Sequence, residues 1–229
     1  MISVITLTYK RKHLLEEAIQ SFLMQDIDGC EMIVINDCKE TEYRYENQKN
    51  VRILNISERF PSVFDKLMYG FSVAKNDYLY RLDDDDLLYQ NSLEEAIKEI
   101  QQNKGYDIYR SKKHHYFLNN QYQGRNGNVN NGNIYTKNYI QSITENPPKQ
   151  FGEDYWMTFA NNANIYEYDY DTMIYRWGMQ TYHISGLGDI SQEKMYNLVD
   201  NHKLDTIGVY KLNPHFDKNY YKEINDANK

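Results

Sequence analysis

Four consecutive aspartates, Asp83–Asp86, stand inside the otherwise apolar stretch "YLYRLDDDDLLY". Adjacent carboxylates repel one another, and a carboxylate is costly to bury without a partner. Leucines hold the run on both sides, so some of the carboxylates are expected to converge in a solvent-facing cleft. Converging carboxylates need a cation, and their hard oxygen ligands suit Mg²⁺ or Mn²⁺, ions that are usually shared with substrate phosphates. A solvated acidic loop before a helix N-terminus is the alternative interpretation.

A second acidic pair, Glu153 and Asp154, lies in "GEDYW" and precedes aromatic residues and a predicted helix. Such a pair could simply start the helix, because carboxylates are favoured at a helix N-terminus. Downstream of a metal and phosphate site, it also fits a general base that takes the proton of an incoming hydroxyl.

The remaining candidates are basic residues, namely Lys10, Arg11, Lys12, His114, His115 and His183. The first three could face a diphosphate, although a solvated surface is the favoured interpretation. The adjacent histidines are expected at the surface. His183 follows "YRW" in a glycine-containing loop and could reach a metal or a phosphate.

Alternating strand and helix patterns position these residues. Short apolar runs predict buried strands at 2–8, 31–36, 51–55 and 77–82, and apolar residues at helical spacing predict helices at 13–25, 62–74 and from 92 onward. Ser92 and Glu95 fit a capping box at the start of the third helix. This alternation predicts an α/β protein with a mainly parallel sheet flanked by helices. Ligands bind such sheets at the carboxyl ends of the strands, where Thr8, Asp37 and the aspartate run all lie.

The pattern weakens after Gly105. Residues 111–133 are polar and rich in Asn and Gly, which indicates loops with one irregular hairpin. A short strand and helix are expected within 134–143, a helix after residue 152, strands at 164–169 and 172–177, and a helix near 191–202. The tail after Leu204 shows little periodicity, and neither an internal repeat nor a domain boundary is evident.

The composition limits the classes of protein to which the chain can belong. The chain has 229 residues, 41% hydrophobic and 26% charged, as expected of one soluble globular domain. Its net charge of −7 argues against generic binding to nucleic acid or anionic membranes. Only two cysteines occur, which favours a reducing compartment, and no apolar run approaches the roughly 20 residues of a membrane helix. A cytoplasmic location without a transmembrane segment is therefore expected.

Taken together, these motifs resemble the family 2 glycosyltransferases of the GT-A fold. The family's opening, roughly V-S-V-I-I-P-T-Y-N-R, corresponds to "ISVITLTYKR", and its V-D-D-G-S to "VINDCK". Its metal motif, roughly L-D-x-D-D, corresponds to "LDDDD", and its later E-D pair to "GEDYW". The sequence departs from the family at Leu7, at Asn36 and at Cys38–Lys39, and it has Leu67–Met68 in place of an Arg/Asn pair.

The resemblance implies a single GT-A (Rossmann-like) domain with a small irregular C-terminal extension. Residues 1–105 would form the nucleotide-sugar-binding half, residues 106–204 the acceptor-binding and catalytic half, and residues 205–229 a tail. The implied enzyme moves a sugar from a nucleotide-sugar, most commonly a UDP-sugar, to an acceptor hydroxyl with inversion. The acceptor could be a glycan, a lipid-linked sugar, a protein or a modified nucleobase.

The resemblance also assigns roles to individual residues. Thr8 and Tyr9 would line the nucleotide base, and Asp37 would hydrogen-bond it. Lys66 stands near, but offset from, the positions of the family's Arg/Asn pair and would be a further contact of the nucleotide-sugar. Asp83 and Asp84 would approach the ribose and diphosphate, and Asp85 would ligate Mn²⁺ or Mg²⁺, with His183 as a further candidate ligand. Asp154 would be the catalytic base, next to Glu153.

Two other classes of protein remain open. A sugar-phosphate nucleotidyltransferase also pairs a Rossmann-like sheet with a metal aspartate, but it usually carries a glycine-rich basic loop, and "TYKRKH" contains no glycine. A non-catalytic nucleotide-sugar-binding module would have no need to retain both the aspartate run and the later acidic pair.

Overall fold

A seven-stranded, mainly parallel sheet forms the centre of the protein. The computed structural model describes all residues except 47–49, 128–129, 149–151, 160 and 179–204. The strands in spatial order are β11 (Ile165–Tyr168), β7 (Ile108–Ser111), β10 (Ile134–Thr136), β5 (Tyr78–Arg81), β1 (Ile2–Thr8), β2 (Glu31–Asn36) and β4 (Val51–Asn55). Only β10 is antiparallel to its neighbours within this sheet. The predicted strand–helix alternation is confirmed.

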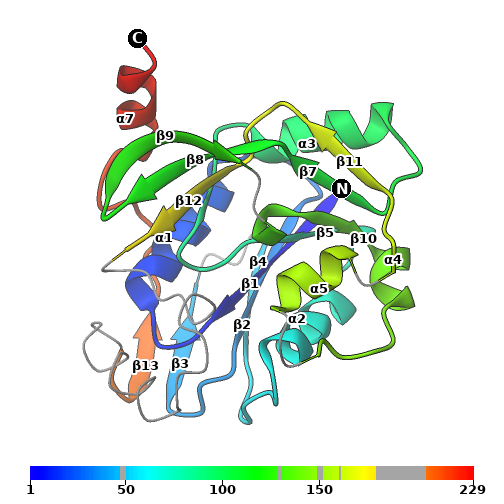
Figure 1. Ribbon diagram of the computed structural model, residues 1–229. Coiled ribbons are helices and arrows are strands. Elements are labelled where there is room, and N and C mark those ends of the chain that lie inside the picture. The colour runs from blue at the N-terminus through cyan, green and yellow to red at the C-terminus, as the bar shows by residue number, and fades with distance from the viewer. Residues whose placement is uncertain (47–49, 128–129, 149–151, 160, 179–204) are drawn as a thin grey trace.

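Helices cover both faces of this sheet (Figure 1). Side chains alternate along each strand, so Val4 and Met32 enter one apolar core, whereas Ile5 and Ile33 enter the other. Helices α1 (Lys12–Leu23) and α3 (Ser92–Gln102) pack on the first face, and α2 (Val63–Ser72), α4 (Lys137–Ser142) and α5 (Glu153–Phe159) on the second. Continuous apolar strands are therefore required, because both faces are buried.

Helix α2 lies unusually close to the sheet at Gly70. A Cβ atom on this residue would be 2.5 Å from Cγ2 of Ile5 and 3.4 Å from Cγ1 of Ile35. Ser62 caps the helix by accepting a hydrogen bond of 3.0 Å from the backbone N–H of Asp65. The cap and the glycine together set where the helix begins and how closely it approaches β1.

A second, four-stranded sheet has the order β6 (Leu87–Leu88), β12 (Met173–Trp177), β8 (Lys113–Leu118) and β9 (Gln121–Gly127). Strands β8 and β9 form the predicted irregular hairpin, with a register shift between Tyr116 and Phe117. His114 and His115 lie on β8 and are each only 4% exposed, so their expected surface location is wrong. The reason is that β8 is an inner strand, paired on one side with β12 and on the other with β9.

The tail contains a strand and a helix, which its weak periodicity did not predict. Strand β13 (Gly208–Lys211) pairs in parallel with β3 (Thr41–Arg44). Helix α7 (Tyr220–Ala227) places Tyr220, Tyr221 and Ile224 in a third apolar cluster with side chains of the four-stranded sheet. Elements this short show no periodicity over a useful window, and their partners are distant in the sequence.

The predicted capping box at the third helix does not form. The N-cap is Asn91, in the left-handed region with φ of 57°, and Ser92 donates its hydroxyl proton to the carbonyl of Thr172 at 2.6 Å. The helix expected near 191–202 lies outside the described residues. Within the part of the chain that the structure describes, no helix is long and apolar enough to cross a membrane.

Candidate functional site

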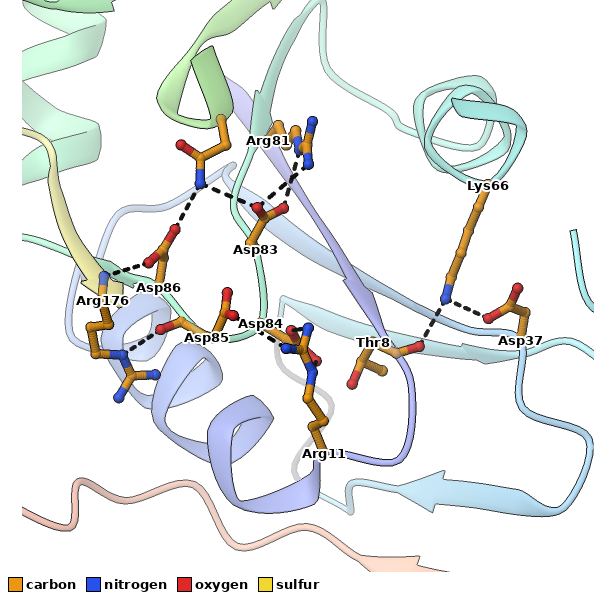
Figure 2. A network of polar contacts seen from close by, with 11 residues as sticks. Thr8, Arg11, Asp37, Lys66, Arg81, Asp83, Asp84, Asp85, Asp86 and Arg176 are labelled. Atoms are coloured by element: carbon orange, nitrogen blue, oxygen red, sulfur yellow. Dashed lines mark hydrogen bonds and ion pairs between the residues drawn. The ribbon is translucent and has the colours of Figure 1, made fainter. Parts of the chain in front are cut away.

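The acidic run Asp83–Asp86 follows β5 after one residue, Leu82, and leads into β6. Strand β1 pairs in parallel with both β5 and β2, so the carboxyl ends of all three strands meet at one edge of the sheet. Thr8 ends β1, and Asp37 follows β2 at the same edge (Figure 2). The residues predicted to meet at this edge are therefore brought together.

The run is more buried than expected. Asp84, Asp85 and Asp86 are 0%, 2% and 0% exposed, which contradicts the expected solvent-facing position. The chain turns from β5 straight into β6, whose leucines are themselves fully buried, so the loop cannot reach the surface. Carboxylates this deeply buried need compensating partners.

Arg11 supplies one of these partners, and its expected solvated position is wrong. Its guanidinium donates to the carboxylate of Asp84 and, through Nη1, to Oδ2 of Asp85 at 3.2 Å. The side chain is only 14% exposed, because it reaches back from the start of α1 over the acidic run.

Two further arginines reach the run from neighbouring strands. Arg81, the last residue of β5, donates from Nε to Oδ1 of Asp83 at 3.1 Å. Arg176 on β12 donates its backbone N–H to Oδ1 of Asp86 at 2.8 Å and its side-chain Nε to the carbonyl of Asp85. Both arginines are buried, and Figure 2 shows their contacts with the run.

Three of the four carboxylates converge. Asp83, Asp85 and Asp86 each offer an oxygen, and these atoms lie within 4.8 Å of one another. Asn131 bridges two of them by donating to Oδ2 of Asp86 at 2.8 Å and to Oδ2 of Asp83 at 3.1 Å. A set of hard carboxylate oxygens is the donor chemistry that Mg²⁺ and Mn²⁺ prefer.

The carboxyl groups of the run differ in the direction of their pKa shifts. Burial raises the pKa of Asp86 well above its ordinary range, and the charges of Asp85 and Asp83 raise it further. Burial also raises the pKa of Asp84 to about 6, with Arg11 opposing the shift. For Asp83 burial acts in the same direction, but Arg81 and Asn131 outweigh it and lower the pKa. A bound cation would offset the burial penalty at these groups.

The later acidic pair joins the same network. Glu153 and Asp154 occupy the first turn of α5, and Oε1 of Glu153 pairs with Nη2 of Arg81 at 2.8 Å. Arg81 therefore contacts Asp83 through Nε and, at 3.4 Å, through Nη2, and the same Nη2 pairs with Glu153. Oδ1 of Asp154 accepts the backbone N–H of Tyr155 at 2.7 Å.

The side of the site near β2 is organised by a buried ion pair. Nζ of Lys66 on α2 lies 2.5 Å from Oδ1 of Asp37 and donates to the carbonyl of Thr8 at 2.8 Å. Oδ2 of Asp37 accepts the backbone N–H of Phe60 at 3.2 Å. Burial lowers the pKa of Lys66, and Asp37 opposes that shift. Lys66 thus holds the two strand ends together.

Tyr9 directly follows β1 and is partly exposed. The guanidinium carbon of Arg59 is 4.4 Å from the centroid of its ring. A planar cation stacked on an aromatic ring makes a flat polar surface of the kind that can line a base.

Arg11 was considered only as a residue that could face a diphosphate. The sequence did not identify Arg81, Arg176 and Asn131 as partners of the buried carboxylates, nor Asp86 as a member of the convergent triad. One usable signal was present: Arg81 and Arg176 each stand within an otherwise apolar strand, where a cation requires a buried partner. His183 lies outside the described residues.

Comparisons with known proteins agree with this geometry. Residues 3–163 match the family described as "Glycosyl transferase family 2". A protein of Haemophilus influenzae described as an uncharacterized glycosyltransferase is 27% identical over 104 residues, 45% of this chain and 35% of that protein. S. aureus TarS 1-349 in complex with UDP-GlcNAc superposes with a TM-score of 0.65 at 17% identity, covering 86% of this chain and 64% of that one.

Mannosyltransferase PcManGT from Pyrobaculum calidifontis, in complex with GDP-Man and Mn²⁺, gives a TM-score of 0.56 at 12% identity, covering 76% of this chain and 56% of that one. The predicted α/β GT-A fold is thereby confirmed. The chain spans about a third of the length of the Haemophilus protein and less than two thirds of either structure.

Proposed function

Because the chain belongs to glycosyl transferase family 2, we propose that it transfers a sugar from a nucleotide-sugar to an acceptor hydroxyl with inversion at the anomeric carbon. A UDP-sugar is the proposed donor. Similarity in fold to TarS in its complexes with UDP-GlcNAc and with UDP supports this choice. The family match and the glycosyltransferase relative favour sugar transfer over nucleotidyl transfer.

One observation carries the proposal. Three carboxylates converge at the carboxyl edge of a parallel sheet, and a buried arginine, Arg81, connects them with the acidic pair at the start of α5. Arg81 thus links the proposed cation site to Glu153, the neighbour of the proposed base Asp154. A sugar-phosphate bond held between the cation site and the base would have its leaving group at the cation and its reacting carbon toward the base.

The chemistry of the donor set fits Mn²⁺ or Mg²⁺. Asp85 would hold the ion, joined by Asp83 and Asp86, whose oxygens complete the triad. When bound, the ion would neutralise charge that develops on the leaving nucleoside diphosphate. The complex of the mannosyltransferase with Mn²⁺ and a nucleotide-sugar supports the metal assignment.

The nucleotide would lie between the acidic run and β2. Thr8 and Tyr9 would line the base, and Asp37 would hydrogen-bond it, while Asp83 and Asp84 would approach the ribose and diphosphate. Each carboxylate oxygen of Asp37 accepts a hydrogen bond within the protein and has capacity for a second. Lys66 would act by holding Asp37 rather than by reaching the diphosphate.

Asp154 would be the general base, with Glu153 beside it. Its carboxylate would take the proton of the acceptor hydroxyl as that oxygen attacks the anomeric carbon. The bond between that carbon and the diphosphate oxygen would break on the opposite face, so the configuration inverts. Residues 1–105 would thus bind the donor, and residues 106–204 would bind the acceptor and contribute the base.

The test is a screen of nucleotide-sugars by thermal unfolding with Mn²⁺ and, separately, with a chelator. A ligand at about 100 times its Kd adds about 2.7 kcal/mol of stability, which for a chain of this size corresponds to roughly 5–10 °C in Tm. We expect such a shift for a UDP-sugar with Mn²⁺, together with slow release of UDP. Equal Tm values with and without every nucleotide-sugar would contradict the proposal.

A further inference from the structure

Residues 205–229, termed the C-terminal segment, lie outside the part of the chain that matches the family. They contain β13 and α7, and α7 packs beside β9 at the far end of the molecule from β13 (Figure 1). Between these ends the segment contacts α1 repeatedly: Asn213 donates its backbone N–H to Oε1 of Glu16 at 2.6 Å, and Asp217 donates to Oε1 of Glu17 at 3.0 Å. The segment is therefore an integral part of the fold.

At its beginning the segment fixes the backbone around Arg11. The N–H of Asp205 donates to the carbonyl of Lys10 at 2.9 Å, and Oδ2 of Asp205 accepts the N–H of Lys12 at 2.8 Å. The hydroxyl of Tyr43 donates to the same carboxylate at 2.5 Å. Arg11, which pairs with the acidic run, is thus held from the residue before it and from the residue after it.

At its end the segment fixes the side chain of Arg176. The hydroxyl of Tyr220 accepts a hydrogen bond of 2.8 Å from Nη1 of Arg176 and donates to Oε2 of Glu17 at 3.2 Å, and the same Nη1 also pairs directly with that oxygen of Glu17. All three residues are at most 3% exposed. Burial raises the pKa of Tyr220 to about 12, with Arg176 opposing the shift, so the hydroxyl keeps the proton that this arrangement needs.

Arg176 connects Tyr220 with the acidic run. Its Nε donates to the carbonyl of Asp85, and its backbone N–H donates to Oδ1 of Asp86 (Figure 2). A guanidinium is a rigid planar group, so fixing Nη1 also fixes the direction of Nε. Loss of the contact at Tyr220 would leave Glu17 as the remaining partner of Nη1, so the guanidinium and the backbone that carries two members of the triad would be held less firmly.

We propose that Tyr220 and Asp205 are positioning residues for the donor site, acting on the acidic run through Arg176 and Arg11. This inference rests on the proposed function, because it assigns the acidic run to metal and nucleotide. It makes the C-terminal segment a support of that site, acting through Arg11 and Arg176.

Tyr220→Phe tests the inference, with Tyr109→Phe as the matched control. Tyr109 is also a buried tyrosine, 1% exposed, whose hydroxyl donates one hydrogen bond of 2.8 Å to the carbonyl of Asn103. Hydrogen exchange of the peptide 82–90 should become faster in Tyr220→Phe and not in the control. The affinity for UDP in Mn²⁺ should fall about 5- to 10-fold, less than the full worth of a hydrogen bond to a charged group, because Tyr220 acts on the site only through Arg176, while Tyr109→Phe should keep the wild-type affinity.

A second variant, Asp205→Ala, tests whether the changes in hydrogen exchange and UDP affinity are confined to substitutions in α7. It removes the carboxylate beside Arg11 and should accelerate exchange of the same peptide and weaken UDP binding in Mn²⁺. Exchange and affinity in both variants equal to those of Tyr109→Phe would overturn the inference. A wild-type protein without metal-dependent UDP binding would instead refute the proposed function, and the exchange comparison would then decide the positioning role alone.

Discussion

Replacing Lys66 with Met should destabilise the protein strongly, because it leaves a carboxylate buried without its cation. The side chains of Lys66 and Asp37 are 8% and 6% exposed, and Nζ lies 2.5 Å from Oδ1. Removing one partner of a buried pair costs about 3–5 kcal/mol. Domains are typically stable by about 5–15 kcal/mol, so Lys66→Met should lose a large part of the total.

The effect should depend on the charge of Asp37. In Lys66→Met combined with Asp37→Asn no buried charge is left unpaired, so the double variant should recover much of the stability that Lys66→Met loses. The resulting coupling energy should be about 2 kcal/mol, toward the upper end for residues in contact. Lys98→Met is the matched control: its side chain is 48% exposed and pairs with Glu94 and Glu95 at the surface.

Urea unfolding of the wild type, these three variants and the single variant Asp37→Asn that completes the cycle, followed by circular dichroism, provides the measurement. The order of midpoints should be wild type and Lys98→Met highest, the double variant next, and Lys66→Met lowest. A midpoint of Lys66→Met close to that of Lys98→Met would refute the reasoning, because the pair would then behave as a surface contact.

Three further predictions concern catalysis, pH and packing. Asp154→Asn should lower kcat by about 10²–10⁴ with donor KM and Tm nearly kept; if Glu153→Gln is inactive and Asp154→Asn is not, the base is misassigned. The buried imidazole of His114 has a pKa of about 4 against an ordinary 6.5, so the unfolded chain takes up its proton first and the folded state loses stability as pH falls from 6.5 toward 4. That loss should be at most about 3 kcal/mol, and unfolding of His114→Gln across this range should show a shallower dependence; equal slopes would exclude the assignment. Gly70→Ala should cost about 1–3 kcal/mol in urea unfolding, because its Cβ would meet Ile5 at 2.5 Å; unchanged stability would mean that α2 shifts freely.

The central sheet could be predicted because its strands are continuous apolar runs bounded by helices of clear amphipathic spacing. The same logic placed Thr8, Asp37 and the aspartate run at one edge, since parallel strands align their carboxyl ends. The resemblance to a family then supplied roles that spacing alone could not give.

The arginines that pair with the buried carboxylates could not be predicted in the same way. Arg11 and Arg176 are far apart in the sequence, and each contacts the acidic run through the tertiary fold. Burial of Asp85 follows from the short turn into β6, and a strand of two residues leaves no period to detect. The tail was misjudged for a similar reason, because β13 is regular only when paired with β3.

Whether the acidic run holds a metal on the donor diphosphate can be decided by calorimetry of UDP binding to the wild-type protein and to Asp85→Asn, in Mn²⁺ and in a chelator. Asparagine keeps the size of the side chain at a position that is 2% exposed, so the fold should be retained and circular dichroism can verify it. We expect the wild type to bind UDP in Mn²⁺, and we expect that binding to be lost in the chelator and lost in Asp85→Asn. UDP affinity that is the same in all of these conditions would contradict the assignment of the acidic run to a metal on the donor diphosphate.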